Sequence, residues 1–142
     1  MRRIFLDTNV ILDLLAKRNP FYDSIAKLAT LADLKKVILI AAPISFTTAD
    51  YVLSKYDSRE NVLIKLRKFE VICEVCTIDE ATIEKALNSE FQDFEDAVQY
   101  FSALQADCSI IITRNEKDFK YSSLPIMTAE EYLSSISDSN LS

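Results

Sequence analysis

The fold is decided near the N-terminus by the stretch Arg3-Ile4-Phe5-Leu6-Asp7-Thr8-Asn9, in which a short apolar run ends abruptly in an acid, a hydroxyl and an amide. An amphipathic run over residues 10–16 follows at once. This order is typical of a buried parallel strand, whose C-terminal end carries Asp7, followed by a helix. Ligands of open α/β sheets bind at such strand ends. Asp7 is therefore either the N-cap of the helix or a metal-binding carboxylate.

Strands and helices are predicted to alternate along the rest of the chain. Because alternating strands and helices build a parallel sheet covered on both faces, the pattern indicates an α/β fold. Apolar runs predict buried strands at 37–41, 70–76 and 109–113, and a short edge strand at 124–127. Helical spacing predicts helices over 22–35, 46–55, 60–68, 80–87 and 92–106, and Thr128 with Glu131 predicts a capping box that opens a last helix.

The chain of 142 residues has the size of one domain, which we predict to cover residues 1–133. Residues 134–142 form a polar tail that is expected to be disordered. No stretch is apolar enough to span a bilayer, and Asp7 interrupts the N-terminal apolar run before it could serve as a signal peptide. We therefore expect a cytoplasmic protein without membrane association.

The composition excludes several kinds of active site. There is no histidine, which excludes imidazole bases, Ser-His triads and most zinc sites. There is no glycine, which excludes Gly-rich phosphate loops and the dinucleotide fingerprint. The net charge of −6 argues against general electrostatic attraction to nucleic acid, but it is compatible with contact through a bound metal and a local basic patch. Carboxylates are the main catalytic groups that remain.

The spacing of Cys73 and Cys76 matches the redox pattern C-x-x-C. Residues three apart on the strand expected there point to opposite faces of the sheet. We therefore predict that these cysteines and Cys108 are buried and reduced.

The helix predicted over residues 46–55 carries an acid within its apolar stripe. Asp50 lies beside Ala49 and three residues before Leu53. Carboxylates are seldom buried unless they are paired or bind a metal. Asp50 is therefore a candidate site residue, and the alternative is a position in water at the edge of the stripe.

The helix predicted over residues 92–106 begins with several acids. Acids in a first helical turn are favoured by the helix dipole, which is one explanation for Asp93 and Asp96. The same two residues share a face with Ala97 and Tyr100, and that face should turn to the sheet. The second explanation is that they approach the strand ends.

A polar stretch, Thr113-Arg114-Asn115-Glu116-Lys117-Asp118-Phe119, follows the strand predicted at 109–113. If this strand lies next to the first one, both end where the strand order reverses, and Asp118 and Asn115 approach Asp7 there. Several like charges in one crevice are costly unless a divalent cation offsets them. Ligands that are all oxygen suit Mg²⁺ or Mn²⁺.

In order and spacing, these motifs resemble the PIN-domain family, and most closely its branch of toxin components of bacterial toxin–antitoxin systems, the VapC-like ribonucleases. The resemblance runs from Arg3 to about Leu133. It implies a three-layer α/β/α sandwich with a central parallel sheet of four to five strands. It also implies a Mg²⁺- or Mn²⁺-dependent endoribonuclease that hydrolyses RNA phosphodiester bonds at a site of four carboxylates.

The resemblance assigns roles to residues of this chain. Asp7, Asp50 and Asp96 match the first three acids, although relatives more often have Glu at the position of Asp50. The fourth position is open between Asn115, Asp118 and Asp93, because relatives often have Asp where this chain has Asn115. The implied metal ligands are Asp7, Asp50, Asp96 and Asp118, supported by Thr8, Asn9, Asp93 and Thr113. The implied RNA contacts are Arg114 and Lys117, for which plain solvation is the alternative.

Two other functions remain open. A PIN-like module could bind nucleic acid or protein without cleaving it, as the uncertain fourth acid allows. A receiver-like signalling domain also groups acids around Mg²⁺, but it would need a phosphoacceptor Asp at the end of a later strand, where this chain has Cys76-Thr77. For the nuclease, the resemblance implies an RNA substrate, a cognate antitoxin protein and a homodimer.

Overall fold

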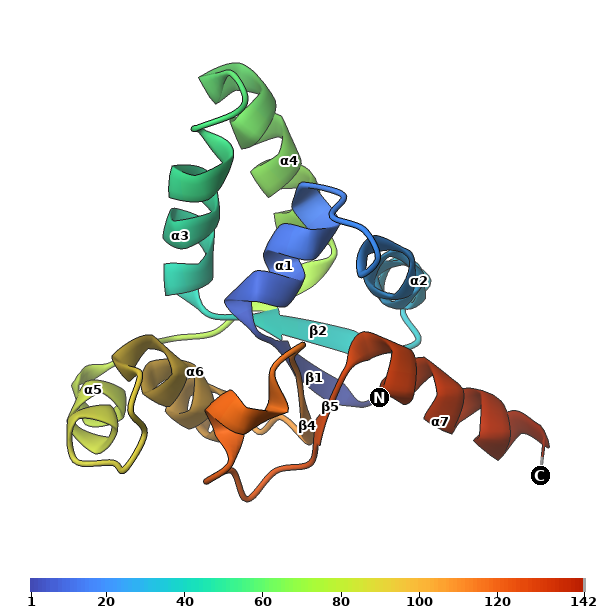
Figure 1. Cartoon of the computed structure of the whole chain (residues 1–142). Coiled ribbons are helices and arrows are strands. Elements are labelled where there is room, and N and C mark those ends of the chain that lie inside the picture. Colours follow the sequence, from blue (N-terminus) through green and yellow to red (C-terminus); the bar gives the residue numbers. More distant parts are fainter. Residues whose placement is uncertain (142) are drawn as a thin grey trace.

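The computed structural model describes residues 1–141, and the side chains of residues 1–137. Within this part, one parallel sheet has the strand order β3-β2-β1-β4-β5 (Figure 1). Because β1 pairs with β2 on one side and β4 on the other, the strand order reverses between β1 and β4. The condition on which the convergence of Asp7 with residues after β4 depends, that these two strands are neighbours, is therefore met. The strands are β1 (Arg3–Leu6), β2 (Ile38–Ala41), β3 (Cys73–Val75), β4 (Ile110–Ile112) and β5 (Ile126–Met127).

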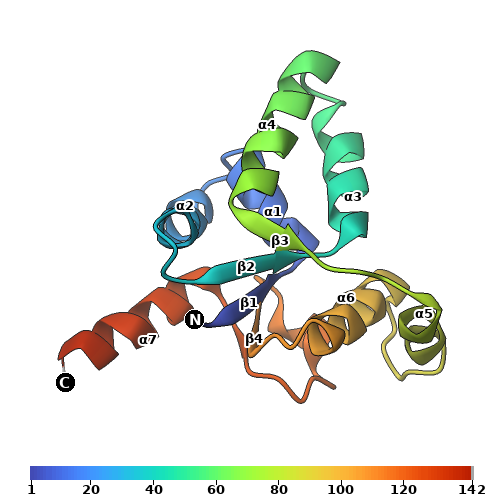
Figure 2. The same ribbon diagram turned by 180° about the vertical axis from the view of Figure 1, so that it is seen from behind.

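Helices cover both faces of the sheet (Figures 1 and 2). They are α1 (Thr8–Leu15), α2 (Tyr22–Asp33), α3 (Pro43–Leu53), α4 (Arg59–Val71), α5 (Glu80–Leu87), α6 (Phe94–Gln105) and α7 (Ala129–Leu141), with a short 3₁₀ helix η1 (Glu116–Phe119). Ile4 and Leu6 on β1 pack with α1, α2, α3, α4 and α7, whereas Phe5 faces the other way and packs with α6 and η1. This alternation follows from the two-residue period of a strand. The α/β/α sandwich is confirmed.

Several element boundaries differ from the predictions. Helix α3 begins at Pro43 and not at residue 46, because proline suits the first helical position, where no backbone N–H is needed. Helix α4 continues through Phe69 to Val71, so β3 is shorter than the strand predicted at 70–76. Phe69 stays helical because its ring packs on Phe46 of α3, at 5.6 Å between ring centroids.

Helix α7 begins with the predicted capping box. The backbone N–H of Glu131 donates to Oγ1 of Thr128, and the N–H of Thr128 donates back to Oε1 of Glu131. The helix continues past residue 133, because Ile136 packs on the core four residues after the buried Tyr132. The prediction of a disordered tail over 134–142 thus differs from the structure over 134–141, and Ser142 lies outside the described residues.

Three helices end in a left-handed residue that is not glycine, because the chain contains none. Lys17, Lys35 and Asp107 follow α1, α2 and α6 with φ angles of 53°, 59° and 57°. After α2, the N–H of Lys35 donates to the carbonyl of residue 32, and the N–H of Lys36 donates to that of residue 31. This pair of bonds is a Schellman motif, in which glycine is normally preferred since a Cβ atom disfavours positive φ.

The three cysteines are free thiols. Cys108 is buried, whereas Cys73 and Cys76 are half-buried. Burial raises the pKa of Cys73 and of Cys108 to about 12, so both thiols stay protonated at neutral pH. The free thiols agree with the prediction of reduced cysteines, whereas the predicted full burial holds for Cys108 and not for Cys73 and Cys76. Separately, no helix in the described part of the chain is both long and apolar enough to cross a membrane.

Candidate active site

Asp7 lies at the end of β1 and is only 4% exposed. Gln99 Nε2 donates to its Oδ1 at 3.0 Å, and Thr113 Oγ1 donates to its Oδ2 at 2.8 Å. Burial raises the pKa of Asp7, although these two hydrogen bonds act in the opposite direction. Asp7 occupies the N-cap position of α1 but makes no capping hydrogen bond through its side chain. The simple N-cap explanation therefore does not account for this acid.

A buried polar network connects three helices around Asp7. Gln99 is 0% exposed, and its Oε1 accepts from the backbone N–H of Thr8 at 3.0 Å. The hydroxyl of Thr8 lies 2.7 Å from that of Ser45 on α3. Neither Gln99 nor Ser45 is among the residues predicted from the sequence. The signal for Gln99 was its position three residues after Asp96, which places both on one face of the helix.

The first turn of α6 carries acids that interact strongly. Asp93 caps the helix, since its Oδ1 accepts from the N–H of Asp96 at 3.0 Å. Burial raises the pKa of Asp96 to about 7, and the charges of Asp93, Asp7, Asp118 and Glu95 add to the effect. Burial, and then the charge of Asp93, also raises the pKa of Glu95. The structure thus brings Asp7, Asp96 and Asp118 into one electrostatic cluster and adds Glu95 to it.

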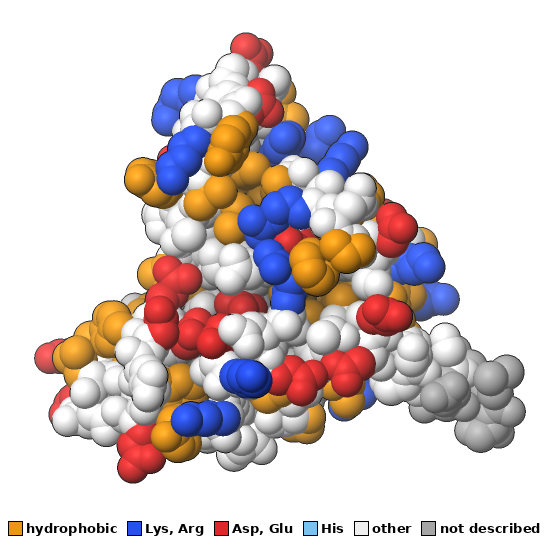
Figure 3. Space-filling model, viewed as in Figure 1, with side chains coloured by type: hydrophobic (Ala, Val, Ile, Leu, Met, Phe, Trp, Pro, Cys, Tyr) orange, Lys and Arg blue, Asp and Glu red, His pale blue; other side chains and the backbone are white. Residues whose placement is uncertain are grey.

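The acids of α6 and η1 line a surface cavity. Asp93, Asp96, Lys117 and Asp118 border it, and its volume is about 480 Å³. Asp and Glu side chains gather on this face between the lower end of α3 and α6 (Figure 3). Asn115 contributes its backbone N–H to Oγ1 of Thr113 at 3.2 Å, while its side chain is exposed. Of the candidates for the fourth position, Asp93 and Asp118 are therefore the ones whose charges act on Asp96.

The described hydrogen bond of Asp50 is local, and its place in the metal site stays a prediction. Its Oδ1 accepts a weak hydrogen bond of 3.4 Å from Ser54, the residue that follows α3. On the same helix, Thr48 donates a hydrogen bond of 3.4 Å to Oε1 of Glu95. Asp50 comes two residues after Thr48, so its side chain leaves α3 about 160° around the helix axis from that of Thr48.

Two of the other predicted site residues have structural contacts. The side chain of Asn9 is exposed, and its carbonyl accepts a hydrogen bond from Arg18. Arg114 Nε donates to Oδ2 of the buried Asp13 at 2.7 Å. The guanidinium carbon of Arg114 also lies 4.2 Å from the centroid of the Phe21 ring. Arg114 is thus held in place by the protein.

The donor chemistry of the cluster fits a hard divalent cation. Its side chains offer oxygen ligands, and no lysine or arginine among the described residues forms an ion pair with Asp7, Glu95, Asp96 or Asp118. The raised pKa of Asp96 reflects its burial first and then this uncompensated negative charge. In the described part of the chain, however, no group of three or more acidic or cysteine side chains is arranged so that it could hold a metal ion.

Fold and site together define an α/β protein with an acidic centre at the carboxyl ends of its parallel strands. The sequence profile of the family described as "PIN domain" matches residues 3–117. The chain belongs to the PIN domain family. The receiver-like alternative is therefore wrong.

Known proteins are similar over most of this chain. It is 29% identical over 135 residues to Ribonuclease VapC1 of Aquifex aeolicus (strain VF5), with 92% of each chain covered. Its fold is similar to that in the crystal structure of VapBC2 from Rickettsia felis bound to a DNA fragment from their promoter. The TM-score is 0.67 and the identity 21%, over 88% of this chain and 96% of the other.

A second solved structure extends the likeness in fold. It is VapC20 of Mycobacterium tuberculosis, described as a Sarcin-Ricin loop cleaving toxin. The TM-score is 0.64 and the identity 11%, over 81% of this chain and 92% of the other. At these identities, both structural matches concern the fold alone.

Proposed function

We propose that this chain is an endoribonuclease that hydrolyses RNA phosphodiester bonds with a bound Mg²⁺ or Mn²⁺. The observation that carries the proposal is the cluster of acids around Asp96, whose pKa is raised to about 7. Like charges of this kind are tolerated where a cation is bound between them. The similarity to Ribonuclease VapC1 supports RNA as the substrate.

Asp7, Asp96 and Asp118 are the residues that would hold the cation. Gln99 and Thr113 orient Asp7 by their hydrogen bonds to its two oxygens. When bound, such a cation lowers the pKa of a water and stabilises charge on the phosphate. Lys117 borders the same cavity as Asp96, which supports its predicted contact with the RNA backbone.

Two acids compete for the second position of the family pattern. The family resemblance favours Asp50, whereas the contacts of α3 favour Glu95, because Thr48 reaches Glu95 and not Asp50. We infer that Glu95 contributes the second carboxylate, and Asp50 remains the competing prediction. The alternative placing of Asn115 in the site stays a prediction as well.

The proposed partner is an antitoxin protein. The similarity to VapC1 and the likeness in fold to the Rickettsia felis VapBC2 structure support a place in a toxin–antitoxin pair. A homodimer is proposed on the family resemblance. An antitoxin-like reading frame beside the gene would support this assignment, and its absence would count against it.

Cleavage of single-stranded RNA by the purified protein tests the proposed activity. We expect cleavage with Mn²⁺, none with EDTA, and a loss of at least ~100-fold in rate for Asp96→Asn, since a lost metal ligand removes several kcal/mol of transition-state stabilisation. Asp33→Asn is the matched control, because Asp33 is an exposed acid at the end of α2.

Paired variants assign the remaining positions. Glu95→Gln should reduce the rate more than Asp50→Asn if the contacts of α3 are decisive, and the reverse order would restore Asp50. Asp118→Asn should likewise reduce the rate more than Asn115→Ala. A larger loss at Asn115 would instead support the position at which relatives often carry Asp.

The second candidate function is a non-catalytic PIN-like binding module. The observation that favours it is the lack, among the described residues, of three acids arranged to hold a metal. It would replace the nuclease if the pure protein cleaved no RNA with either ion and Asp96→Asn behaved like the wild type in cells.

A further inference from the structure

Asp13 on α1 is a buried acid outside the cluster described above. It is 1% exposed, and both of its carboxylate oxygens accept from arginines: Oδ1 from Arg18 Nε at 2.9 Å and Oδ2 from Arg114 Nε at 2.7 Å. A carboxylate at such a depth requires charged partners. Because two guanidinium groups share one carboxylate, this group of three side chains carries a net positive charge.

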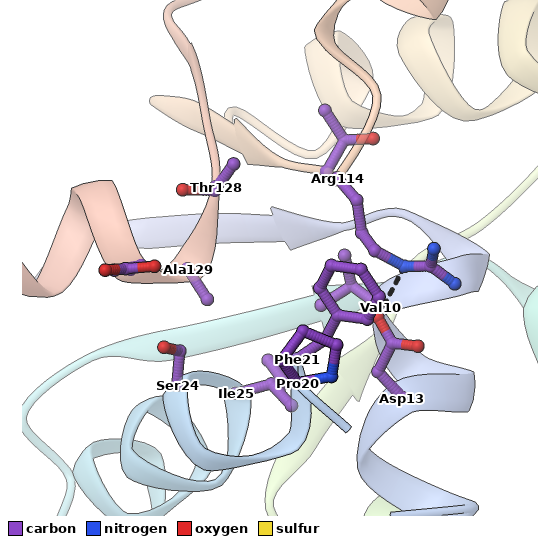
Figure 4. Close-up of a pocket in the computed structure, with 11 residues that line it drawn as sticks. Val10, Asp13, Pro20, Phe21, Ser24, Ile25, Arg114, Thr128 and Ala129 are labelled. Carbon is purple, nitrogen blue, oxygen red and sulfur yellow. Dashed lines mark hydrogen bonds and ion pairs between the residues drawn. The ribbon is translucent and has the colours of Figure 1, made fainter. Parts of the chain in front are cut away.

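Each arginine has a second contact that holds its guanidinium plane. Arg114 lies over the ring of Phe21, and Arg18 Nη2 donates to the carbonyl of Asn9 at 3.1 Å. The side chain of Arg18 is nevertheless 36% exposed, and that of Arg114 is 33% exposed. The Nη groups of Arg114 have no hydrogen-bond partner among the described residues. Figure 4 shows the Nη groups at the tip of the Arg114 side chain. They point away from a cavity of about 200 Å³ that Arg114 helps to line.

Both arginines are linked to the segment around Asp7 through neighbouring residues. Arg114 directly follows Thr113, whose hydroxyl donates to Asp7. Arg18 is bonded to Asn9, which lies in the first turn of α1, two residues after Asp7. Lys and Arg side chains accordingly gather over α1, next to the acidic face (Figure 3).

We propose that Arg18 and Arg114 bind a phosphate of the RNA beside the bond to be cleaved, and that Asp13 is the residue that positions them. A guanidinium fork matches phosphate oxygens in geometry and charge. The net charge of −6 and the acidic cluster repel RNA, so a fixed cationic site next to the acids offsets this repulsion where the substrate must lie. The link to the segment around Asp7 favours RNA over an acidic protein segment. This inference rests on the proposed function.

Binding and cleavage are measured separately, so that the two proposals can fail independently. Fluorescence anisotropy of a single-stranded RNA with EDTA reports binding alone, and steady-state cleavage with Mn²⁺ reports KM and kcat. Arg18→Ala and Arg114→Ala should each raise Kd and KM about tenfold, the loss expected for one charge-assisted hydrogen bond, with kcat changed less than about twofold. The slope of log Kd against log salt should fall by about 0.7 for each lost phosphate contact.

Two controls separate a positioned site from general attraction. Arg67→Ala removes an exposed arginine of α4 and should leave Kd near the wild-type value. Arg18→Lys keeps the charge but removes the planar fork, so it should recover only part of the affinity.

Asp13→Asn tests positioning directly. The variant adds a positive charge to the group, so general attraction alone would tighten RNA binding. We expect weaker binding instead, because the amide holds the two guanidinium groups less firmly. Circular dichroism checks that the variant folds, and Arg114→Lys provides the same test if it does not.

The possible outcomes separate the two proposals. If Arg18→Ala and Arg114→Ala bind RNA like Arg67→Ala while the wild type cleaves, the phosphate site is refuted and the nuclease stands. If the wild type cleaves nothing but both variants lose affinity, the phosphate site stands and the catalytic proposal fails. Tighter binding by Asp13→Asn would overturn the positioning role.

Discussion

Gln99 on helix α6 donates a hydrogen bond of 3.0 Å to Asp7 at the end of strand β1. Its amide oxygen accepts from the backbone N–H of Thr8, also at 3.0 Å. One buried amide therefore joins a helix of one layer to the strand end that carries the candidate metal ligand.

Replacing Gln99 should affect both stability and activity. We expect Gln99→Leu to lower the free energy of unfolding by about 1–3 kcal/mol, because it leaves the buried N–H of Thr8 and one oxygen of Asp7 without partners. RNA cleavage should fall as well, since Asp7 loses a contact that orients it. Urea denaturation measures the first effect. Gln92→Leu, at an exposed position, is the control, and equal midpoints for the two variants would contradict the role given to Gln99.

A divalent cation should stabilise the protein through Asp7. Mg²⁺ or Mn²⁺ at saturation should raise Tm by about 5 °C, because a ligand that binds only the native state stabilises it. Asp7→Asn should abolish this rise. Without metal it should be as stable as the wild type or more so, since it removes a buried charge and its amide can still bond to Thr113. Asp33→Asn is the control, and a full metal response in Asp7→Asn would argue against Asp7 as a ligand.

The metal-free protein should become more stable as the pH falls from about 7.5 towards 4. The pKa of Asp96 is about 7 in the folded chain and 3.8 for an unperturbed aspartate, so the folded state binds more protons between these values. The destabilisation from this acid is therefore complete above pH 7 and is relieved on acidification. Urea titrations at several pH values, with EDTA present, should show a smaller pH dependence in Asp96→Asn. An unchanged dependence would mean that another group titrates.

A glycine at the end of α2 should stabilise the fold. Lys35 has a φ of 59°, which costs a residue with a Cβ atom about 1 kcal/mol relative to glycine. Lys35→Gly should therefore raise the free energy of unfolding by about that amount in thermal or urea unfolding. Lys36→Gly removes the neighbouring lysine, whose φ is negative, and should give no such gain. If both variants behaved alike, the effect would come from the lost charge.

Much of the frame could be predicted from sequence because its signals are local. Apolar runs of strand length, separated by helical spacing, predict alternating elements of an α/β fold. The abrupt change from Leu6 to Asp7 marks a strand end, and the position of Asp96 on the sheet-facing side of α6 follows from helical period. The capping box at Thr128 needs only the four residues that form it.

The contacts that define the site depend on the tertiary structure, because they join residues far apart in sequence. Gln99 reaches Asp7 across 92 positions, and Arg114 reaches Asp13 across 101. Only the packing of α3 against the start of α6 decides that Thr48 meets Glu95, while Asp50 turns about 160° away. The sequence by itself determined which polar residues stand at strand and helix ends. The tertiary structure decided which of them meet, since burial and like charge act between side chains that only the folded chain brings together.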